Sequence, residues 1–309
     1  MKIAFIHNRQ AFLPELQAYR DFFHTHQIAT TVCRYGEESK TDAGVYWYMM
    51  GFYPHSKHRN KIIIHEYASC SVPPLRKEKD FLKRKFHPRP DFRIFLNEYV
   101  QSQLGISDEV PFGYRDMGVS ALFHPPSESP QKEYDFIYAG SLSAHRRLDT
   151  VLDIFAKGPL RDQSVLMLGH DTEGLREDYG KADNIHFHAA VPWTEVPDWL
   201  SKSRYALNFI PDTEPFNAQT PAKFLEYAAM KIPIVSTNTF WIAEFQERYG
   251  GNYFFLKEDL SNMTWDRILH FPFEFPNLES WTWEERIRAS GIMEFLSTVQ
   301  ERNSGGIQI

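Results

Sequence analysis

The chain is poor in cysteine, in long apolar runs and in surplus positive charge, and each shortage excludes a class of protein. Its 309 residues include two cysteines, Cys33 and Cys70, which lie far apart and without metal-ligand spacing. A disulfide scaffold is therefore excluded, and we expect reduced thiols in a cytoplasmic protein. No apolar stretch approaches the roughly 20 residues that span a bilayer. Residues 1–7 turn polar too soon for a secretory signal, and a net charge of −6 argues against bulk binding of nucleic acid.

The length and the strand pattern predict two α/β domains. A chain of 309 residues is long enough for two domains, each with its own core. In the first half, apolar β-branched and aromatic runs alternate with a helical pattern at residues 12–24. The expected strands are residues 2–7, 29–35, 45–50, 61–65 and 92–96. This alternation is typical of a parallel sheet covered by helices on both faces.

In such sheets ligands bind beyond the carboxyl ends of the strands. That rule makes His7 and Arg9, after the first strand, weak candidates for contact with a substrate. His65 ends the fourth expected strand and Glu66 follows it, so we expect both at the rim of the sheet. A histidine in this position is either structural or catalytic, and Glu66 either orients a substrate hydroxyl or caps the following turn.

Positive charge is concentrated in one segment. Residues 71–93 hold eight Lys or Arg against three acids, and Phe81, Leu82 and Phe86 lie among them. We expect a basic, aromatic-flanked helix within residues 76–93 that rests on anionic lipid or grips an anionic, lipid-linked molecule. A merely solvated helix face is the alternative.

The second half repeats the strand–helix pattern after a linker rich in proline and serine near residues 120–133. Its expected strands are residues 134–139, 164–168, 185–188 and 205–210, and the first leads through Gly140 and Ser141 into a helix. A glycine turn between strand and helix lets the backbone approach a phosphate. We expect no metal site, although His186 and His188 alternate on one strand face.

Residues 215–237 are the most informative stretch. They predict a polar loop, a helix that begins at Pro221 with Thr220 as its N-cap, and a buried strand over residues 232–237. Lys223 and Glu226 are three residues apart and share one helix face. A cation in the first turn attracts phosphate, and a carboxylate can accept two hydrogen bonds from a ribose diol. The alternative is an ordinary surface ion pair.

This stretch resembles the donor-nucleotide motif "P-x-K-x-x-E-Y-x-A-x-x-x-P-(I/V)-V-x-T" of retaining family 4-like glycosyltransferases with the GT-B fold. Residues 110–126 are similar to the linker of that family. The resemblance implies two Rossmann-like domains that face each other across a cleft, with a C-terminal helix crossing back to the first. The implied domains are residues 1–124 for the acceptor, residues 125–280 for the nucleotide sugar, and residues 281–309, with a terminal helix over residues 280–296.

The resemblance also implies roles for individual residues. It implies catalytic roles for His65, Arg146 and Lys223, and acceptor contacts for His7, Arg9 and Glu66. The implied donor-binding residues are Gly140, Ser141, Arg146, Gly169, Asn217, Gln219, Thr220, Lys223 and Glu226.

Two positions depart from the family pattern. Ser141 replaces a diphosphate-binding arginine, so that role passes to Arg146 in the position of the family's lysine. Ala218 replaces a glutamate that contacts the donor sugar. The nearby substitutes are Asp212, Glu214, Asn217 and Gln219.

The expected function is transfer of a sugar from a nucleoside diphosphate, of UDP or GDP type, to a hydroxyl of a glycan or lipid-linked acceptor with retention. No cofactor is expected. The expected location is the cytoplasm. If residues 76–93 bind anionic lipid, the protein lies at the inner face of the membrane. Two alternatives stay open, a GT-B-shaped sugar-nucleotide 2-epimerase and a non-catalytic scaffold that binds nucleotide sugars.

Overall fold

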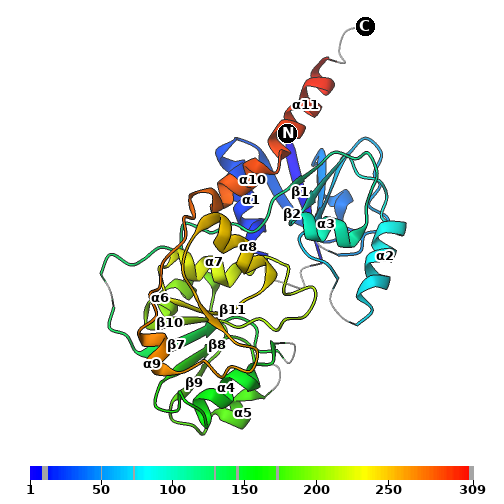
Figure 1. The fold of residues 1–309 in the computed structure, drawn as a ribbon. Coiled ribbons are helices and arrows are strands. Elements are labelled where there is room, and N and C mark those ends of the chain that lie inside the picture. The colour runs from blue at the N-terminus through cyan, green and yellow to red at the C-terminus, as the bar shows by residue number, and fades with distance from the viewer. Residues whose placement is uncertain are drawn as a thin grey trace. The chain divides into compact units, whose positions relative to one another are not determined.

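The computed structural model describes residues 1–8, 13–49, 51–71, 74–128, 130–143, 146–171 and 174–305. The chain divides into two compact units (Figure 1). The first contains residues 1–118 and 280–309, and the second contains residues 119–279. Two parallel sheets with flanking helices confirm the predicted α/β fold with two Rossmann-like domains.

The first unit is built on a six-stranded parallel sheet in the order β2-β1-β3-β4-β5-β6. Its strands are β1 (Lys2–Ile6), β2 (Ala29–Cys33), β3 (Val45–Met49), β4 (Ile62–Tyr67), β5 (Phe92–Phe95) and β6 (Phe112–Tyr114). Its helices are α1 (Pro14–Thr25), α2 (Arg76–Phe86), α3 (Glu98–Leu104), α10 (Trp283–Ala289) and α11 (Ile292–Gly305). The edge strand β6 lies in a stretch that the sequence had suggested was a linker.

Side-chain alternation along the strands builds a core on each face of this sheet. Phe5 and Trp47 face one side, where they contact Tyr19 and Phe23 of α1. Their neighbours Ile6 and Tyr48 face the other side. All five residues of β3 are therefore buried, as the uninterrupted apolar run predicts.

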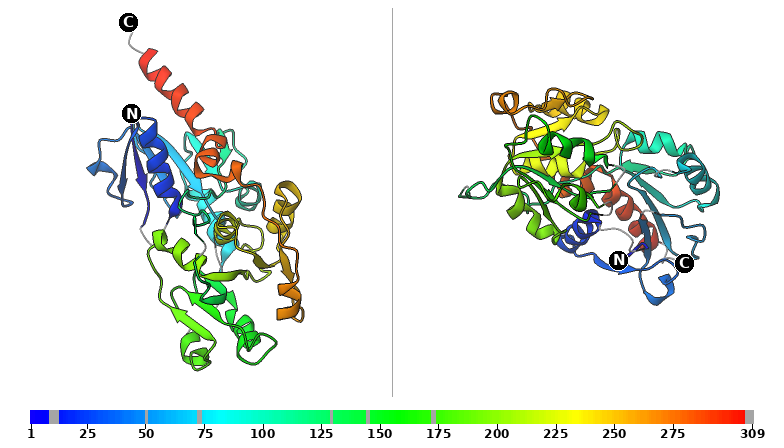
Figure 2. Two further views of the ribbon diagram at one scale, coloured as in Figure 1. Left: turned by 90° about the vertical axis from the view of Figure 1, so that its left-hand side faces the viewer. Right: turned by 90° about the horizontal axis from the view of Figure 1, so that it is seen from below.

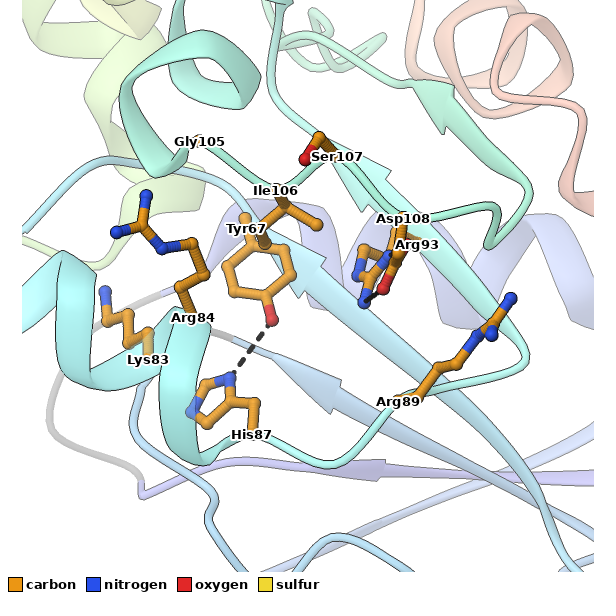
Figure 3. A pocket seen from close by; sticks show the side chains of 10 residues that line it. All are labelled: Tyr67, Lys83, Arg84, His87, Arg89, Arg93, Gly105, Ile106, Ser107 and Asp108. Carbon is orange, nitrogen blue, oxygen red and sulfur yellow. Dashed lines mark hydrogen bonds and ion pairs between the residues drawn. The ribbon is translucent and has the colours of Figure 1, made fainter.

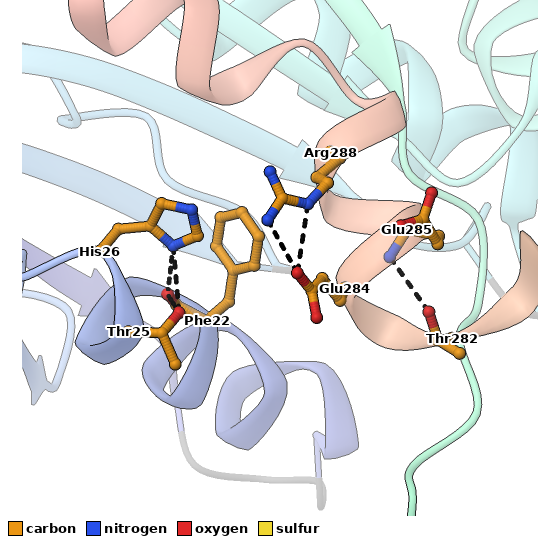
Figure 4. A network of polar contacts seen from close by, with 7 residues as sticks. All are labelled: Phe22, Thr25, His26, Thr282, Glu284, Glu285 and Arg288. Atoms are coloured by element: carbon orange, nitrogen blue, oxygen red, sulfur yellow. Dashed lines mark hydrogen bonds and ion pairs between the residues drawn. The ribbon is translucent and has the colours of Figure 1, made fainter.

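The C-terminal segment packs on α1 within the first unit. Ile287 of α10 and Ile292 of α11 join the core that α1 forms with the sheet. At the surface, the Arg288 guanidinium lies over the Phe22 ring at 5.6 Å and pairs with Glu284 at 2.7 Å (Figure 4). The expectation of one helix over residues 280–296 is wrong, because Gly291 adopts φ +70° and separates α10 from α11 (Figure 2).

The second unit carries a six-stranded parallel sheet in the order β12-β11-β10-β7-β8-β9. Its strands are β7 (Tyr134–Ala139), β8 (Val165–Leu168), β9 (Ile185–His188), β10 (Ser203–Asn208), β11 (Ile234–Thr237) and β12 (Phe254–Leu256). Its helices are α4 (Leu148–Ala156), α5 (Leu175–Tyr179), α6 (Val196–Ser201), α7 (Ala222–Ala229), α8 (Phe240–Tyr249) and α9 (Trp265–Leu269).

Two helix layers cover this second sheet. Leu152 and Phe155 of α4 pack with Phe136 and Met167 on one face, in a core that α5 and α9 complete. On the other face the Ala139 amide donates to Tyr227 Oη of α7 at 2.9 Å. Figure 1 shows α4 and α5 on one side of the strands, with α7 and α8 on the other.

Candidate donor-binding site

Helix α7 is held against the sheet by one face, so its opposite face carries the predicted functional pair. Phe224, Leu225 and Tyr227 are fully buried, and the contact of Tyr227 with Ala139 fixes the helix beside the end of β7. Lys223 in the first turn and Glu226 one turn later therefore point away from the helix core. The expected N-cap role of Thr220 is wrong, because Pro221 occupies the N-cap and Thr220 is buried before it.

The side-chain amine of Lys223 is buried and has no hydrogen-bond acceptor. Its Nζ lies 3.6 Å from the centre of the Tyr138 ring and is buried without a hydrogen-bond partner. Burial lowers the pKa of Lys223 well below its usual value, the charge of Arg146 adds to that lowering, and Glu226 opposes it. An anion at this place would supply the missing partner and favour the ammonium form.

Arg146 brings a second cation to the same region. It follows the β7 strand by a short loop, and its guanidinium lies over the Phe216 ring at 5.3 Å. Gly140 directly follows β7, and a Cβ there would lie 3.4 Å from Lys223 Nζ. Ser141 is exposed, and its carbonyl accepts from Tyr138 Oη at 3.2 Å. The turn after β7 thus lies beside both cations.

Gly169 allows two strand ends to come into close contact. A Cβ at Gly169 would fall 1.8 Å from the carbonyl oxygen of Gly140, a distance that no side chain can adopt. The loops after β7 and β8 continue side by side, since Leu142 forms a parallel bridge with Asp171. Any larger residue at 169 would displace the Gly140 turn from Lys223.

Glu226 is a partly desolvated carboxylate with an indole donor. Trp193 Nε1 donates to Glu226 Oε1 at 2.9 Å. Burial raises the pKa of Glu226 to about 7, against the lowering effects of the Trp193 hydrogen bond and of the Lys223 charge. Near neutral pH this group therefore exists in both protonation states.

The loop before α7 supplies further polar atoms. Asn217 Nδ2 donates to Asp212 at 2.8 Å, while Asn217 Oδ1 and Gln219 Nε2 are buried without hydrogen-bond partners. Ala218, at the position of the family's missing glutamate, is 8% exposed and offers no side-chain polar atom. Asn217 and Gln219 are the groups in this loop whose hydrogen-bonding capacity is unused.

The second unit therefore brings together most of the predicted donor-binding residues. Gly140, Gly169, Arg146, Lys223 and Glu226 gather at the strand ends around α7. The Tyr138 and Phe216 rings and the Trp193 side chain were not selected as site residues from the sequence. The high aromatic content is the signal that could have pointed to them.

The sequence led us to expect His65 at the rim of the first sheet, and this expectation is wrong. Strand β4 continues to Tyr67, so His65 lies inside it and is 2% exposed. Its Nε2 is 2.7 Å from Ser56 Oγ, and Nδ1 is 3.5 Å from Tyr67 Oη. Burial holds the pKa of His65 well below its usual value, with His87 and Arg93 adding to the effect. A neutral imidazole with both nitrogens engaged is suited to holding the core together.

Glu66 is likewise buried, and its expected position at the rim is wrong. Its Oε1 lies 2.7 Å from Arg115 Nη2, and its Oε2 accepts from Trp47 Nε1 at 2.8 Å. Arg115 is 1% exposed and also approaches Glu15 at 3.8 Å. This buried cluster joins one guanidinium and two acidic side chains within the first unit, and no sequence pattern indicated it.

His7 lies directly after β1 and is 8% exposed, and its amide donates to the Cys33 carbonyl at 3.3 Å. Arg9 lies outside the described residues. Across the part of the chain that the structure describes, no helix is long and apolar enough to cross a bilayer. The same residues contain no group of three or more His, Cys, Asp or Glu placed to hold a metal ion.

Residues 133–269, which contain all of the donor-binding candidates, match the family model described as Glycosyl transferases group 1. The match covers most of the second unit. No curated protein matches the chain.

Solved structures match almost the whole chain at low identity. Sucrose-phosphate synthase from Thermosynechococcus elongatus matches with a TM-score of 0.66 and 12% identity over 98% of both chains. Anabaena Alr3699/HepE in complex with UDP-glucose matches with a TM-score of 0.62 and 13% identity, over 99% of this chain and 100% of that one. UDP-GlcNAc 2-epimerase from Methanocaldococcus jannaschii matches with a TM-score of 0.57 and 12% identity, over 96% and 100%. At this identity the likenesses establish the fold.

The fold is that of the GT-B proteins. The match of residues 133–269 to the group 1 model supports a glycosyltransferase as the class of protein. The epimerase shares the fold, so the assignment to the transferases depends on the family match in the second unit.

Proposed function

We propose that the protein transfers a sugar from a nucleoside-diphosphate sugar to an acceptor hydroxyl with retention of anomeric configuration. One observation carries the proposal. Lys223 Nζ is buried without a hydrogen-bond partner in the group 1 domain, beside Arg146 and the Gly140 turn. Such a pair of cations suits the diphosphate of a donor.

In this proposal Lys223 and Arg146 act on the leaving group. Negative charge grows on the diphosphate as its bond to the anomeric carbon breaks, and fixed cations stabilise that charge. Diphosphate binding also favours protonation of Lys223. Glu226 accepts hydrogen bonds from the ribose, while Asn217 and Gln219 contact the sugar or the distal phosphate through their unused polar atoms. We do not extend a catalytic role to His65, because its ring nitrogens are already occupied.

The donor base is proposed to be uracil or guanine. Anabaena Alr3699/HepE binds UDP and UDP-glucose, which supports testing UDP sugars first. The acceptor is proposed to be a glycan or a lipid-linked glycan that the first unit binds. Peripheral contact with anionic membrane is proposed for residues 76–93, where Phe81 and Phe86 are each 48% exposed among basic residues. The reduced thiols of Cys33 and Cys70 suit the cytoplasmic side.

Substitution of Lys223 by methionine tests the proposal. Methionine keeps much of the side-chain volume but removes the charge. We expect Lys223→Met to weaken UDP-glucose or GDP-sugar binding by about tenfold or more, the loss of one charge-assisted contact, and to abolish sugar transfer. Because a poorly compensated buried amine is costly, the unfolding midpoint of the ligand-free protein should not fall. Calorimetry, a transfer assay and a thermal melt measure the three quantities.

Lys181→Met is the matched control, since Lys181 is an exposed lysine in the same unit. It should leave binding and transfer unchanged. Unaltered donor affinity and turnover in Lys223→Met would refute the proposed role.

The 2-epimerase is a second candidate because an epimerase shares this fold. An epimerase converts the nucleotide sugar without any acceptor, whereas a transferase leaves the sugar at C2 unchanged and needs the acceptor hydroxyl. Analysis of the sugar nucleotide after incubation alone separates the two. Donor binding with neither conversion nor transfer would indicate a non-catalytic scaffold.

A further inference from the structure

The first unit contains a cavity of about 250 Å³ that no step of the proposed transfer uses. It lies between the C-terminal half of α2, the end of β4, and the segment that follows α3 (Figure 3). Residues from three separate parts of the chain therefore line the cavity. It is formed by the fold of the first unit and not by one face of a single helix.

The walls of this cavity are strongly basic. Four cationic side chains, Lys83, Arg84, Arg89 and Arg93, line it together with a single carboxylate, Asp108. Asp108 is already engaged by Arg93, which contacts it through both terminal nitrogens, one of them at 2.8 Å. The charges of Lys83, Arg84 and Arg89 are therefore in excess within the pocket.

Lys83 is the most enclosed of these three. Its side chain is 15% exposed, and the Asp80 carboxylate lies 3.8 Å from its Nζ on the same helix. Burial lowers the pKa of Lys83, and the Asp80 charge offsets that effect in part. A second anion beside Lys83 would stabilise the ammonium form.

The uncharged imidazole of His87 lines the same cavity and donates a hydrogen bond within it. His87 Nε2 accepts from the Tyr53 amide at 2.8 Å, so the proton of this imidazole is assigned to Nδ1. Burial lowers the pKa of His87 to about 4, which keeps the ring neutral. Its Nδ1–H then donates to Tyr67 Oη at 3.0 Å (Figure 3). The tyrosine hydroxyl in turn faces His65 Nδ1 at 3.5 Å.

We infer that this pocket binds a phosphate group. Arginine forks and an ammonium match phosphate oxygens from several sides, and Tyr67 and His87 complete the wall beside them. Exposed Phe81, Leu82 and Phe86 lie on the same helix α2. Both a lipid headgroup and a free phosphate carry the required chemistry, and the experiment separates these sources. The inference does not depend on the donor chemistry of the second unit.

Two double variants with equal loss of charge test the inference in the full-length protein. Arg84→Ser with Arg89→Ser removes two cations of the pocket. Lys77→Ser with Lys85→Ser removes two exposed cations from the same helix outside the pocket. One arm titrates inorganic phosphate by calorimetry. The other measures sedimentation with phosphatidylcholine vesicles that contain or lack phosphatidic acid.

We expect the pocket variant to bind phosphate about tenfold or more weakly than the control, consistent with the loss of charge-assisted contacts. A difference confined to the calorimetric arm assigns the pocket to a soluble phosphate, and a difference in the vesicle arm assigns it to a headgroup. No phosphate binding by the unmodified protein in either arm, or equal behaviour of the two variants, overturns the inference.

Donor affinity provides an independent check, because UDP-glucose binding should be the same in both double variants. A protein that fails to bind UDP-glucose contradicts the proposed function but leaves this comparison intact. Where the double pocket variant does not fold, Arg89→Ser against Lys85→Ser repeats the test, since both positions are exposed.

Discussion

At the scale of single residues, Glu226 is a group whose protonation state changes within the physiological pH range. Its pKa is raised to about 7, chiefly by burial. A ribose diol donates hydrogen bonds to the charged carboxylate and therefore binds best to the deprotonated form. The uncharged acid prevails below that pKa and the carboxylate above it.

This pKa predicts how donor affinity depends on pH. With a value near 7, the carboxylate fraction rises from about a tenth at pH 6 to about nine-tenths at pH 8. Affinity for UDP-glucose should therefore rise by up to about tenfold over this interval. A donor sugar nucleotide is the suitable probe, because its diphosphate does not titrate there. Calorimetry at several pH values measures the slope.

Glu226→Gln is the matched variant, since its amide does not titrate. We expect its affinity to change little between pH 6 and pH 8. Deprotonation of Lys223 would act in the opposite direction, so the comparison of the two proteins isolates the carboxylate. The same slope in both proteins would contradict the assignment.

The buried cluster of Arg115, Glu66 and Glu15 shows what residue identity alone cannot reveal. Charged residues are mostly exposed, so a sequence pattern gives no reason to bury these three. The burial of these charged groups is tolerated because each has a partner of opposite charge: Arg115 lies 2.7 Å from Glu66 and 3.8 Å from Glu15. The partners are far apart in the sequence, and only the fold of the first unit brings them together.

At the scale of elements, Gly291 determines the shape of the C-terminal segment. Its φ of +70° ends α10 and lets α11 begin in a new direction. The family resemblance led us to expect a single helix over residues 280–296, and a glycine is tolerated within helices at a modest cost. The break lets Ile287 of α10 and Ile292 of α11 both enter the core beside α1.

Gly291→Ala should destabilise the first unit by about 1 kcal/mol, because an alanine rarely adopts a left-handed conformation. The space around Gly291 is open, so strain in the backbone is the sole cause. Gly44→Ala is the control, because its surroundings are equally open and its φ is not left-handed. Hydrogen exchange of the α1 and α10 amides measures the effect. Equal protection in the two variants would refute this account.

At the scale of the whole molecule, the proposed donor should stabilise the protein as a ligand of the folded state. At a concentration of about 100 times Kd, a ligand adds roughly 2.7 kcal/mol to the free energy of unfolding. We expect the thermal midpoint to rise with the diphosphate of the correct base and with its sugar. A series with UDP, GDP and dTDP identifies that base. No shift with any of them would contradict a nucleotide-sugar site.

Much of the candidate donor site could be predicted from the sequence because its main parts are local. Lys223 and Glu226 are one helical turn apart, and a proline and a buried strand mark the two ends of their helix. Gly140 and Gly169 follow strands whose apolar runs were clear. In contrast, the Trp193–Glu226 hydrogen bond and the Lys223–Tyr138 contact join distant segments. No spacing rule connects those partners.

The amino-acid sequence by itself determined the parallel α/β architecture, because buried strands read as continuous apolar runs and helices as periodic ones. It also determined which short helix carries Lys223 and Glu226, the pair proposed to bind the donor. Only the tertiary structure decided that His65 and Glu66 lie inside β4, that Lys223 is left without an acceptor, and that four cations line one cavity. Burial and charge neighbours are properties of packing between distant segments, and packing fixes both the pKa of a group and its partners.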